Sequence, residues 1–251
     1  MIRVQKYGGS SLSTVEQIKE IAQGISESYK NGDQMIVILS AMGSTTNELQ
    51  LLSKKICSTP SQREMDMLLS SGERISISLM SMALQNLGCK AISFTGSQAG
   101  ILTTGDHNDA TIKELKPIRV DESLKENKIV IIAGYQGVTP ETKEITTLGR
   151  GGSDTTAVAF ASHYNVNECE IYKDVNGIYS EDPKQNPKAS FYEQISYDNL
   201  LKILYNGAGV LHHKSVEHAK KLNTKIRVMN INLNTEFHPA ANNTMGTLVS
   251  F

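Results

Sequence analysis

The segment from Thr147 to Thr156, TLGRGGSDTT, combines several groups that can bind an anion. Three of the four residues at 149–152 are glycines, which let the backbone bend and approach a ligand closely. Ser153 and Asp154 favour helix N-caps, so a helix is expected to begin there, and the N–H groups at a helix N-terminus attract negative charge. Arg150 adds a guanidinium that matches a carboxylate or a phosphate. Taken alone, the segment is more simply explained as a glycine-rich turn with a good helix cap.

A second glycine-rich turn lies near the N-terminus. Residues 2–7 have the pattern of a strand, and Gly8, Gly9 and Ser10 follow before a helical pattern begins. The N–H groups of such a turn bind phosphates, and Lys6 at the end of the strand can place its ammonium on the same phosphates. The spacing is neither G-x-x-x-x-G-K-[ST] nor G-x-G-x-x-G, so it supports neither a P-loop nor a dinucleotide fingerprint.

The elements that must position these groups alternate between strands and helices. Strands are expected at 2–7, 35–39, 91–94, 128–133, 169–172 and 225–229, with a last edge strand at 247–249. Helices are expected at 15–25, from about residue 48, from 60 to about 87, after Asp154, at 197–205 and at 215–222. Several strands are continuous apolar runs, which are typical of strands buried on both faces. The order predicts a mainly parallel sheet with helices on both faces.

Polar residues collect just past the ends of the predicted strands. They are Lys6, Ser40, Thr46, Tyr135 and Arg150. In open parallel sheets ligands bind at the carboxyl ends of the strands, so this clustering predicts an active site there. Glu73 interrupts the apolar stripe of the long helical region, and by itself it is best explained as a solvated helix residue.

Composition excludes several classes of protein. The chain has 251 residues, of which 39% are hydrophobic and 20% are charged, and its net charge is −1. No general attraction to nucleic acid or to an anionic membrane follows from this charge. No apolar stretch approaches the roughly 18 residues of a membrane span, and no signal peptide is recognised. The cysteines at 57, 89 and 169 lack the spacing of a disulfide framework or a zinc site. We therefore expect a cytoplasmic protein without nucleic-acid or membrane partners.

Several separated motifs resemble the catalytic domain of the aspartate kinases, within the amino-acid kinase family. The motifs are KYGGSS at 6–11, LSAMG at 39–43, SGER at 71–74, FTG at 94–96, GYQG at 134–137, TLGRGGSD at 147–154 and DVNGIY at 174–179, with DP at 182–183. The resemblance covers almost the whole chain and implies a three-layer αβα sandwich. It implies one amino-acid kinase domain at 1–251, with an amino-acid-binding lobe at 1–165 and a nucleotide-binding lobe at 166–251, and a homodimer.

The resemblance also implies a reaction. ATP and L-aspartate would give 4-phospho-L-aspartate and ADP, the first step toward lysine, threonine and methionine. A carboxylate is already ionised at pH 7, so it needs no general base, and catalysis must supply positioning and positive potential. Mg²⁺ would accompany ATP, and no residue is assigned as a metal ligand.

By the same resemblance, Lys6 neutralises the transferring phosphoryl group and Asp154 orients Lys6. Arg150 would bind the α-carboxylate of aspartate and Glu73 its ammonium group. The remaining residues of the amino-acid pocket would be Ser40, Thr46, Tyr135 and Ser153. The residues implied for ATP are Lys6, Gly8, Gly9, Ser10, Lys173, Asp174, Tyr179, Asp182, Lys184, Gly209 and Val210. Charges in a loop such as 173–184 are usually only solvated.

The sequence departs from the family pattern in three ways. Many members have Lys where Gly209 stands and Arg where Lys184 stands. The family usually continues into paired ACT domains that carry feedback regulation, whereas this sequence ends at Phe251. We therefore expect a kinase without these domains, which lysine, threonine and methionine inhibit only by competing with aspartate.

Two other functions stay open at this point. One is a sibling kinase of the same fold that acts on glutamate or a nucleotide, although Glu73 with Arg150 favours a free amino acid. The other is a sensor that binds an amino acid or a nucleotide without catalysis, although Lys6 and Asp154 are both retained.

Overall fold

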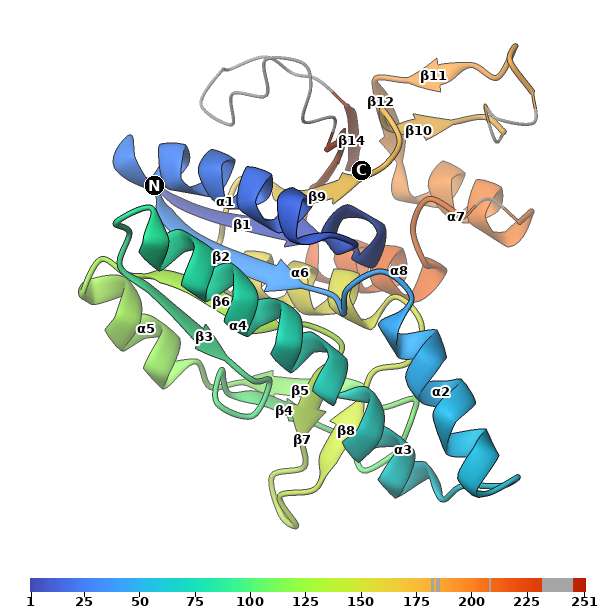
Figure 1. Cartoon of the computed structure of the whole chain (residues 1–251). Coiled ribbons are helices and arrows are strands. Elements are labelled where there is room, and N and C mark those ends of the chain that lie inside the picture. Colours follow the sequence, from blue (N-terminus) through green and yellow to red (C-terminus); the bar gives the residue numbers. More distant parts are fainter. Residues whose placement is uncertain (182, 184–185, 208, 232–245) are drawn as a thin grey trace.

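In the computed structural model, which describes residues 1–181, 183, 186–207, 209–231 and 246–251, the centre of the protein is a sheet of eight strands (Figure 1). Their spatial order is β12 (Gln194–Ser196), β14 (Thr247–Ser250), β13 (Ile226–Asn230), β9 (Cys169–Lys173), β1 (Ile2–Tyr7), β2 (Gln34–Leu39), β6 (Ile129–Ala133) and β3 (Ala91–Phe94). Neighbouring strands pair in parallel except β13 and β14, which are antiparallel. The prediction of a mainly parallel sheet is confirmed.

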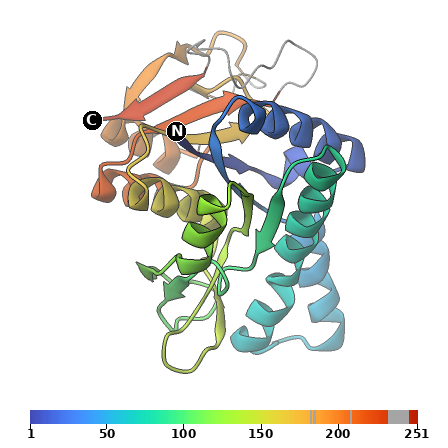
Figure 2. The same cartoon turned by 90° about the vertical axis from the view of Figure 1, so that its left-hand side faces the viewer.

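Helices cover both faces of this sheet (Figures 1 and 2). One face carries α1 (Val15–Lys30) and α4 (Ser71–Asn86), and the other carries α5 (Ile118–Lys125), α6 (Gly152–His163), α7 (Tyr197–Tyr205) and α8 (His213–Leu222). Strand β2 shows why both faces are buried: Val37 packs with the α1 and α4 side chains, whereas Ile38 packs with those of α6. Successive side chains of a strand point to opposite faces, so a continuous apolar strand needs a helix layer on each side. The predicted αβα sandwich is confirmed.

A smaller unit projects beyond the carboxyl ends of the main strands (Figure 2). It consists of a second sheet with the order β5 (Ile112–Leu115), β4 (Ile101–Thr103), β7 (Gln136–Val138) and β8 (Ile145–Thr147), together with α2 (Thr45–Ile56) and α3 (Gln62–Leu69). The remaining elements are a 3₁₀ turn at Gly9–Leu12 and a hairpin of β10 (Ile178–Tyr179) and β11 (Phe191–Tyr192).

Two sequence-based expectations were wrong. Strand β14 is not at the edge, because it pairs with β12 on one side and with β13 on the other. The helical region at 60–87 is two helices that separate at Ser70, whose carbonyl oxygen accepts a hydrogen bond from Gln136 Nε2 at 2.8 Å. Strand β4 of the small sheet was not among the strands expected from the sequence.

Candidate active site

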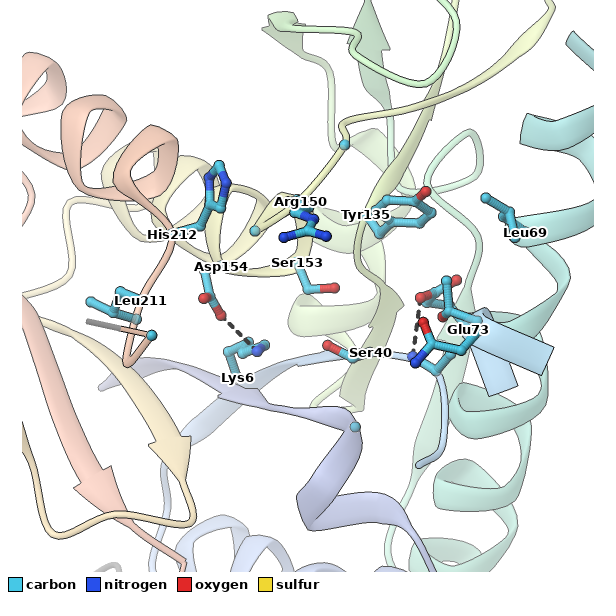
Figure 3. A pocket seen from close by; sticks show the side chains of 18 of the residues that line it. Lys6, Ser40, Leu69, Glu73, Tyr135, Arg150, Ser153, Asp154, Leu211 and His212 are labelled. Carbon is cyan, nitrogen blue, oxygen red and sulfur yellow. Dashed lines mark hydrogen bonds and ion pairs between the residues drawn. The ribbon is translucent and has the colours of Figure 1, made fainter. Parts of the chain in front are cut away.

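A cavity of about 940 Å³ lies where the main sheet meets the small sheet (Figure 3). Its lining includes all eight residues predicted for catalysis and for the amino-acid pocket, which are Lys6, Ser40, Thr46, Glu73, Tyr135, Arg150, Ser153 and Asp154. Lys6 is on β1, Ser40 directly follows β2, and Tyr135 closely follows β6. The adjacent parallel strands β1, β2 and β6 end at one edge of the sheet, and this brings residues together that are 129 positions apart (6 to 135).

A buried carboxylate binds two ammonium groups at one end of the cavity. Asp154 Oδ1 lies 2.6 Å from Lys6 Nζ, and its Oδ2 lies 3.3 Å from Lys173 Nζ. Burial and, to a smaller extent, the charge of Lys173 lower the pKa of Lys6 to about 8, although Asp154 stabilises the protonated form. Burial opposes ionisation of Asp154, but the attraction of Lys173 and Lys6 outweighs it and lowers the pKa of Asp154 to about 2. Asp154 is therefore a carboxylate at neutral pH and Lys6 is mostly an ammonium.

The N-terminus of α6 faces this cavity, but its cap differs from the prediction. Neither Ser153 nor Asp154 is the N-cap: the helix begins at Gly152, and Gly151 is the cap, with φ of 74° and no side-chain cap hydrogen bond. A Cβ atom on Gly151 would come within 2.3 Å of the Cβ of His212. Only glycine fits both this contact and the left-handed backbone, so glycine takes the cap. Ser153 and Asp154 are thereby placed in the first turn, with their side chains in the site (Figure 3).

Glu73 at the other end of the cavity is buried, which corrects the expectation of a solvated residue. Its side chain accepts a hydrogen bond from Ala41 N at 3.0 Å through Oε1, while Oε2 is buried without a hydrogen-bond partner in the described part of the chain. Gly72 makes this possible, because a Cβ at that position would approach the Cβ of Ala41 to 2.8 Å. Burial raises the pKa of Glu73 to about 7. A carboxylate held this way stabilises a cation placed beside Oε2.

Tyr135 lines the cavity from a left-handed backbone conformation, with φ of 71°. Its N–H group donates to Thr156 Oγ1 at 3.3 Å, and its carbonyl accepts from Leu148 N at 2.8 Å. A non-glycine residue in this conformation costs about 1–2 kcal/mol, and such strain is concentrated at functional sites. Figure 3 shows the Tyr135 ring beside Arg150, above Ser40.

The residues expected to bind ATP are only partly assembled. Lys6, Gly9, Lys173 and Gly209 line the cavity. Gly8, Ser10, Asp174, Tyr179 and Val210 are not among its described lining residues. The Tyr179 ring instead meets the Phe191 ring edge to face at 5.3 Å. Asp182 and Lys184 lie outside the described residues, so the roles predicted for them stay predictions.

The sequence analysis did not identify Asp66, a buried carboxylate that links three segments behind the cavity wall. Asp66 of α3 is fully buried and accepts hydrogen bonds from His107 Nδ1 at 2.6 Å, from Asn108 N at 3.1 Å and from Thr147 Oγ1 at 2.5 Å. These bonds hold the loop after β4 against α3, and Asn108 of this loop lines the cavity.

Other lining residues that the sequence did not single out include Asn47, Gln50, Met65, Leu69 and His212. Asn47 and Gln50 are one and four positions after Thr46 on α2, so helical spacing from a predicted site residue could have indicated Gln50. His212 precedes α8 and packs on Gly151, a contact without a local sequence signal.

Known proteins resemble this chain in sequence and in structure. Residues 1–230 match the sequence model of the amino acid kinase family. An aspartokinase of Corynebacterium glutamicum is 51% identical over 225 residues, which are 90% of this chain and 53% of that protein. This chain therefore spans about half the length of that curated relative.

Two solved structures extend the comparison. The crystal structure of an aspartate kinase from Synechocystis has a TM-score of 0.84 and 41% identity, over 100% of this chain and 40% of that one. Escherichia coli aspartokinase III, solved with aspartate and ADP, has a TM-score of 0.81 over 100% of this chain and 64% of that one. At 23% identity the second likeness concerns the fold alone.

Proposed function

Since this chain belongs to the amino acid kinase family, we propose that it carries the catalytic domain of an aspartate kinase. A side-chain carboxylate oxygen of L-aspartate would attack the γ-phosphorus of ATP, the bond from that phosphorus to the β–γ bridging oxygen would break, and ADP would leave with the electron pair. The carboxylate is ionised at neutral pH, with a reference pKa of about 3.9, so no base has to remove a proton. Repulsion between two anions opposes the reaction, and catalysis therefore rests on positive charge and positioning.

The observation that carries this proposal is the unpartnered oxygen of Glu73. An ionised carboxylate at 3% exposure is costly unless a cation meets it, and Oε2 has no hydrogen-bond partner in the described chain. An amino acid supplies an ammonium group, whereas a nucleotide acceptor offers none with a positive charge at neutral pH. The site thus favours a free amino acid over the phosphate acceptors used by other kinases of this fold.

The other charges of the cavity fit the remaining groups of aspartate. Figure 3 shows Lys6 with Asp154 at one end, Glu73 at the other, and Arg150 and Ser153 above the space between them. In the proposed complex, Glu73 binds the ammonium and Arg150 binds the α-carboxylate. The side-chain carboxylate then points to Lys6, where the phosphoryl group would arrive.

We also propose that Mg²⁺ arrives with ATP. Among the residues that the structure describes, no group of three or more His, Cys, Asp or Glu could hold a metal ion. Mg²⁺ commonly binds through substrate phosphates and one or two carboxylates while it keeps several waters, so a protein-built cage is not required. The ion would neutralise part of the phosphate charge. Lys6, Gly9, Lys173 and Gly209 are the described candidates for contacts with the phosphates on the protein side.

The homodimer expected from the resemblance also stays a proposal. Sedimentation equilibrium would measure the mass of the particle in solution and so test it.

The cysteines at 57, 89 and 169 are free thiols, which suits the reducing cytoplasm that the sequence favours. No helix in the described part of the chain has both the length and the apolar character needed to cross a bilayer.

A product assay tests the reaction. The protein is incubated with Mg-ATP and L-aspartate, L-glutamate, UMP or no acceptor, and both ADP release and hydroxylamine-trapped acyl phosphate are measured. We expect both ADP release and trapped acyl phosphate when the acceptor is aspartate, and neither signal with the other acceptors. Acyl phosphate with glutamate only, phosphoryl transfer to UMP, or ADP release that is independent of the acceptor would each contradict the assignment.

Replacing Arg150 with Lys should weaken aspartate binding and leave the KM for ATP nearly unchanged. A single ammonium replaces a planar fork that can bind a carboxylate through two hydrogen bonds, so the loss should be about 1–3 kcal/mol. Steady-state kinetics with each substrate varied in turn measure this effect. Arg119→Lys on α5 is the matched control. A collapse of ATP affinity with normal aspartate affinity would move Arg150 to the phosphate site.

Replacing Glu73 with Gln should raise the KM for aspartate at pH 8 by about 30-fold or more, since loss of a buried charge partner costs at least about 2 kcal/mol. The pH dependence provides the sharper test. The pKa of Glu73 is raised to about 7, so below pH 7 its carboxyl becomes protonated and cannot pair with an ammonium. In the wild-type protein the KM for aspartate should therefore fall as the pH rises through about 7, and in Glu73→Gln this step should disappear. Glu122→Gln on α5 is the control, and a step that persists in Glu73→Gln would remove this residue from ammonium binding.

A further inference from the structure

Two lysines share the two oxygens of one buried carboxylate. Lys6 contacts Oδ1 of Asp154 and Lys173 contacts Oδ2. A single lysine would be enough to neutralise Asp154, so the cluster carries a net charge of about +1 at neutral pH. This excess positive charge is buried at the end of a cavity, where an anion would be strongly attracted.

The sheet register fixes where the second ammonium lies. Lys6 of β1 pairs with Ile171 of β9, and side chains two residues apart on a strand share a face. Lys173 therefore projects from the same face as Lys6, about 7 Å further toward the carboxyl edge of the sheet. Exposure agrees with this order, since the Lys6 side chain is 5% exposed and that of Lys173 is 20% exposed. Both residues line the same cavity.

We propose that Lys173 is a second catalytic cation, which contacts the γ-phosphoryl group together with Lys6 while Asp154 holds both ammonium groups in place. This inference rests on the proposed phosphoryl transfer and assigns a role in it. In the transition state the charge is spread over the three equatorial phosphoryl oxygens, so cations on both sides stabilise it better than one. Both lysines remain protonated throughout, and no proton moves to or from them.

The geometry also distinguishes Lys173 from a structural ion pair. Asp154 already has Lys6 at 2.6 Å, and the contact to Lys173 is longer, at 3.3 Å. Lys173 lowers the pKa of Lys6, so its charge opposes that of Lys6 in the substrate-free protein. When a γ-phosphate binds beside the two ammonium groups, both would attract it, and its negative charge would offset their mutual repulsion.

Kinetics of Lys173 variants test the proposal. Lys173→Met should lower kcat by about 10²-fold, the scale for one preorganised charge donor, with a change in the KM for aspartate below about threefold. Lys173→Arg keeps the charge and should stay within about tenfold of wild type. Lys90→Met, an exposed lysine at the amino end of β3, is the control. Normal turnover in Lys173→Met, or equal damage in the Met and Arg variants, would overturn the proposal.

A binding measurement keeps the test independent of the acceptor. Calorimetry with Mg²⁺ and the β,γ-imido analogue of ATP is compared with calorimetry with ADP, since only the former carries a γ-phosphate. Lys173→Met should weaken the analogue by about tenfold or more and ADP by far less, because a hydrogen bond to a charged group contributes about 1.5–3 kcal/mol. Equal effects on both ligands would refute a γ-phosphate contact. A wild-type protein that phosphorylates no acceptor would instead refute the proposed function, while the two affinities would still decide the contact of Lys173.

Discussion

Replacing Lys6 with Met is expected to lower kcat by about 10²–10³-fold without lowering the stability of the protein. Lys6 Nζ is the more deeply buried of the two ammonium groups at the carboxyl edge of the sheet, and Asp154 holds it at 2.6 Å. Met has a side chain of similar length and no charge, so the substitution removes the positive potential and keeps most of the packing. Asp154 retains Lys173 as a partner. The variant should therefore lose activity without losing stability.

The pKa of Lys6 determines how its effect on stability should change with pH, and over which pH range. Burial lowers it from 10.5 to about 8, so between pH 8 and 10.5 the unfolded chain binds more protons at this residue than the folded protein. The contribution of Lys6 to stability therefore rises with pH in that range, and below pH 8 the cost of keeping the buried lysine charged lowers stability. Lys6→Met escapes this cost. Its melting temperature at pH 7 should equal or exceed that of wild type.

Thermal melts from pH 7 to pH 10.5 and kcat at pH 7 measure both effects. The difference in melting temperature between Lys6→Met and wild type should shrink as the pH rises above 8. Lys90→Met is the control, and it should change neither kcat nor this difference. Near-normal turnover in Lys6→Met would remove Lys6 from the mechanism, and a large loss of stability at pH 7 would show that the ion pair supports the fold.

Residues at strand ends could be predicted from the sequence because their position follows from local patterns. Apolar runs mark the buried strands, and parallel strands end at one edge, so Lys6, Ser40 and Tyr135 were expected to meet. The structure brings them to one cavity. The αβα layers follow from the same runs, since each needs apolar partners on both faces.

Contacts between distant elements could not be predicted in this way. Glu73 reads as an exposed helix residue, and only the approach of Gly72 to Ala41 buries it. Asp66 and Asn108 are 42 residues apart, and their hydrogen bond depends on how α3 meets the small sheet. Gly151 replaces the expected caps because His212, 61 positions later, leaves no room for a side chain. Local propensity depends only on residues that are near one another in the sequence. The burial of Glu73, the hydrogen bond of Asp66 and the cap at Gly151 depend instead on how distant elements pack together.

Short strands were missed for a related reason. Strands β10 and β11 have two residues each and β12 has three. Such lengths carry too few side chains to show a period of two. As a result, β14 was expected at the edge of the sheet and lies inside it.

Replacing Asp154 with Asn is expected to impair both activity and stability, in contrast to Lys6→Met. The side chain is nearly isosteric, but the two ammonium groups lose their shared counter-charge. Removing one partner of a buried ion pair typically costs about 3–5 kcal/mol, because an uncompensated charge remains. The attraction of Asp154 also raises the pKa of Lys6, so in the variant this pKa should fall below its present value of about 8. Part of Lys6 would then be neutral at pH 7, and kcat should fall by about 10³-fold.

The pH profile separates this electrostatic role from simple packing. If protonated Lys6 is required, kcat/KM of the wild-type protein should decline above about pH 8, and the decline should move to lower pH in Asp154→Asn. The pH dependence of stability is a second test. The pKa of Asp154 is lowered from 3.8 to about 2, so its stabilising effect is complete above pH 3.8 and is lost as the pH falls toward 2. The stability difference between wild type and variant should therefore shrink in acid. Asp198→Asn, which removes an exposed ion pair with Lys220, is the matched control and should cost less than about 1 kcal/mol. An unchanged alkaline decline in Asp154→Asn would show that Asp154 does not set the charge of Lys6, and its role in orienting that lysine would have to be abandoned.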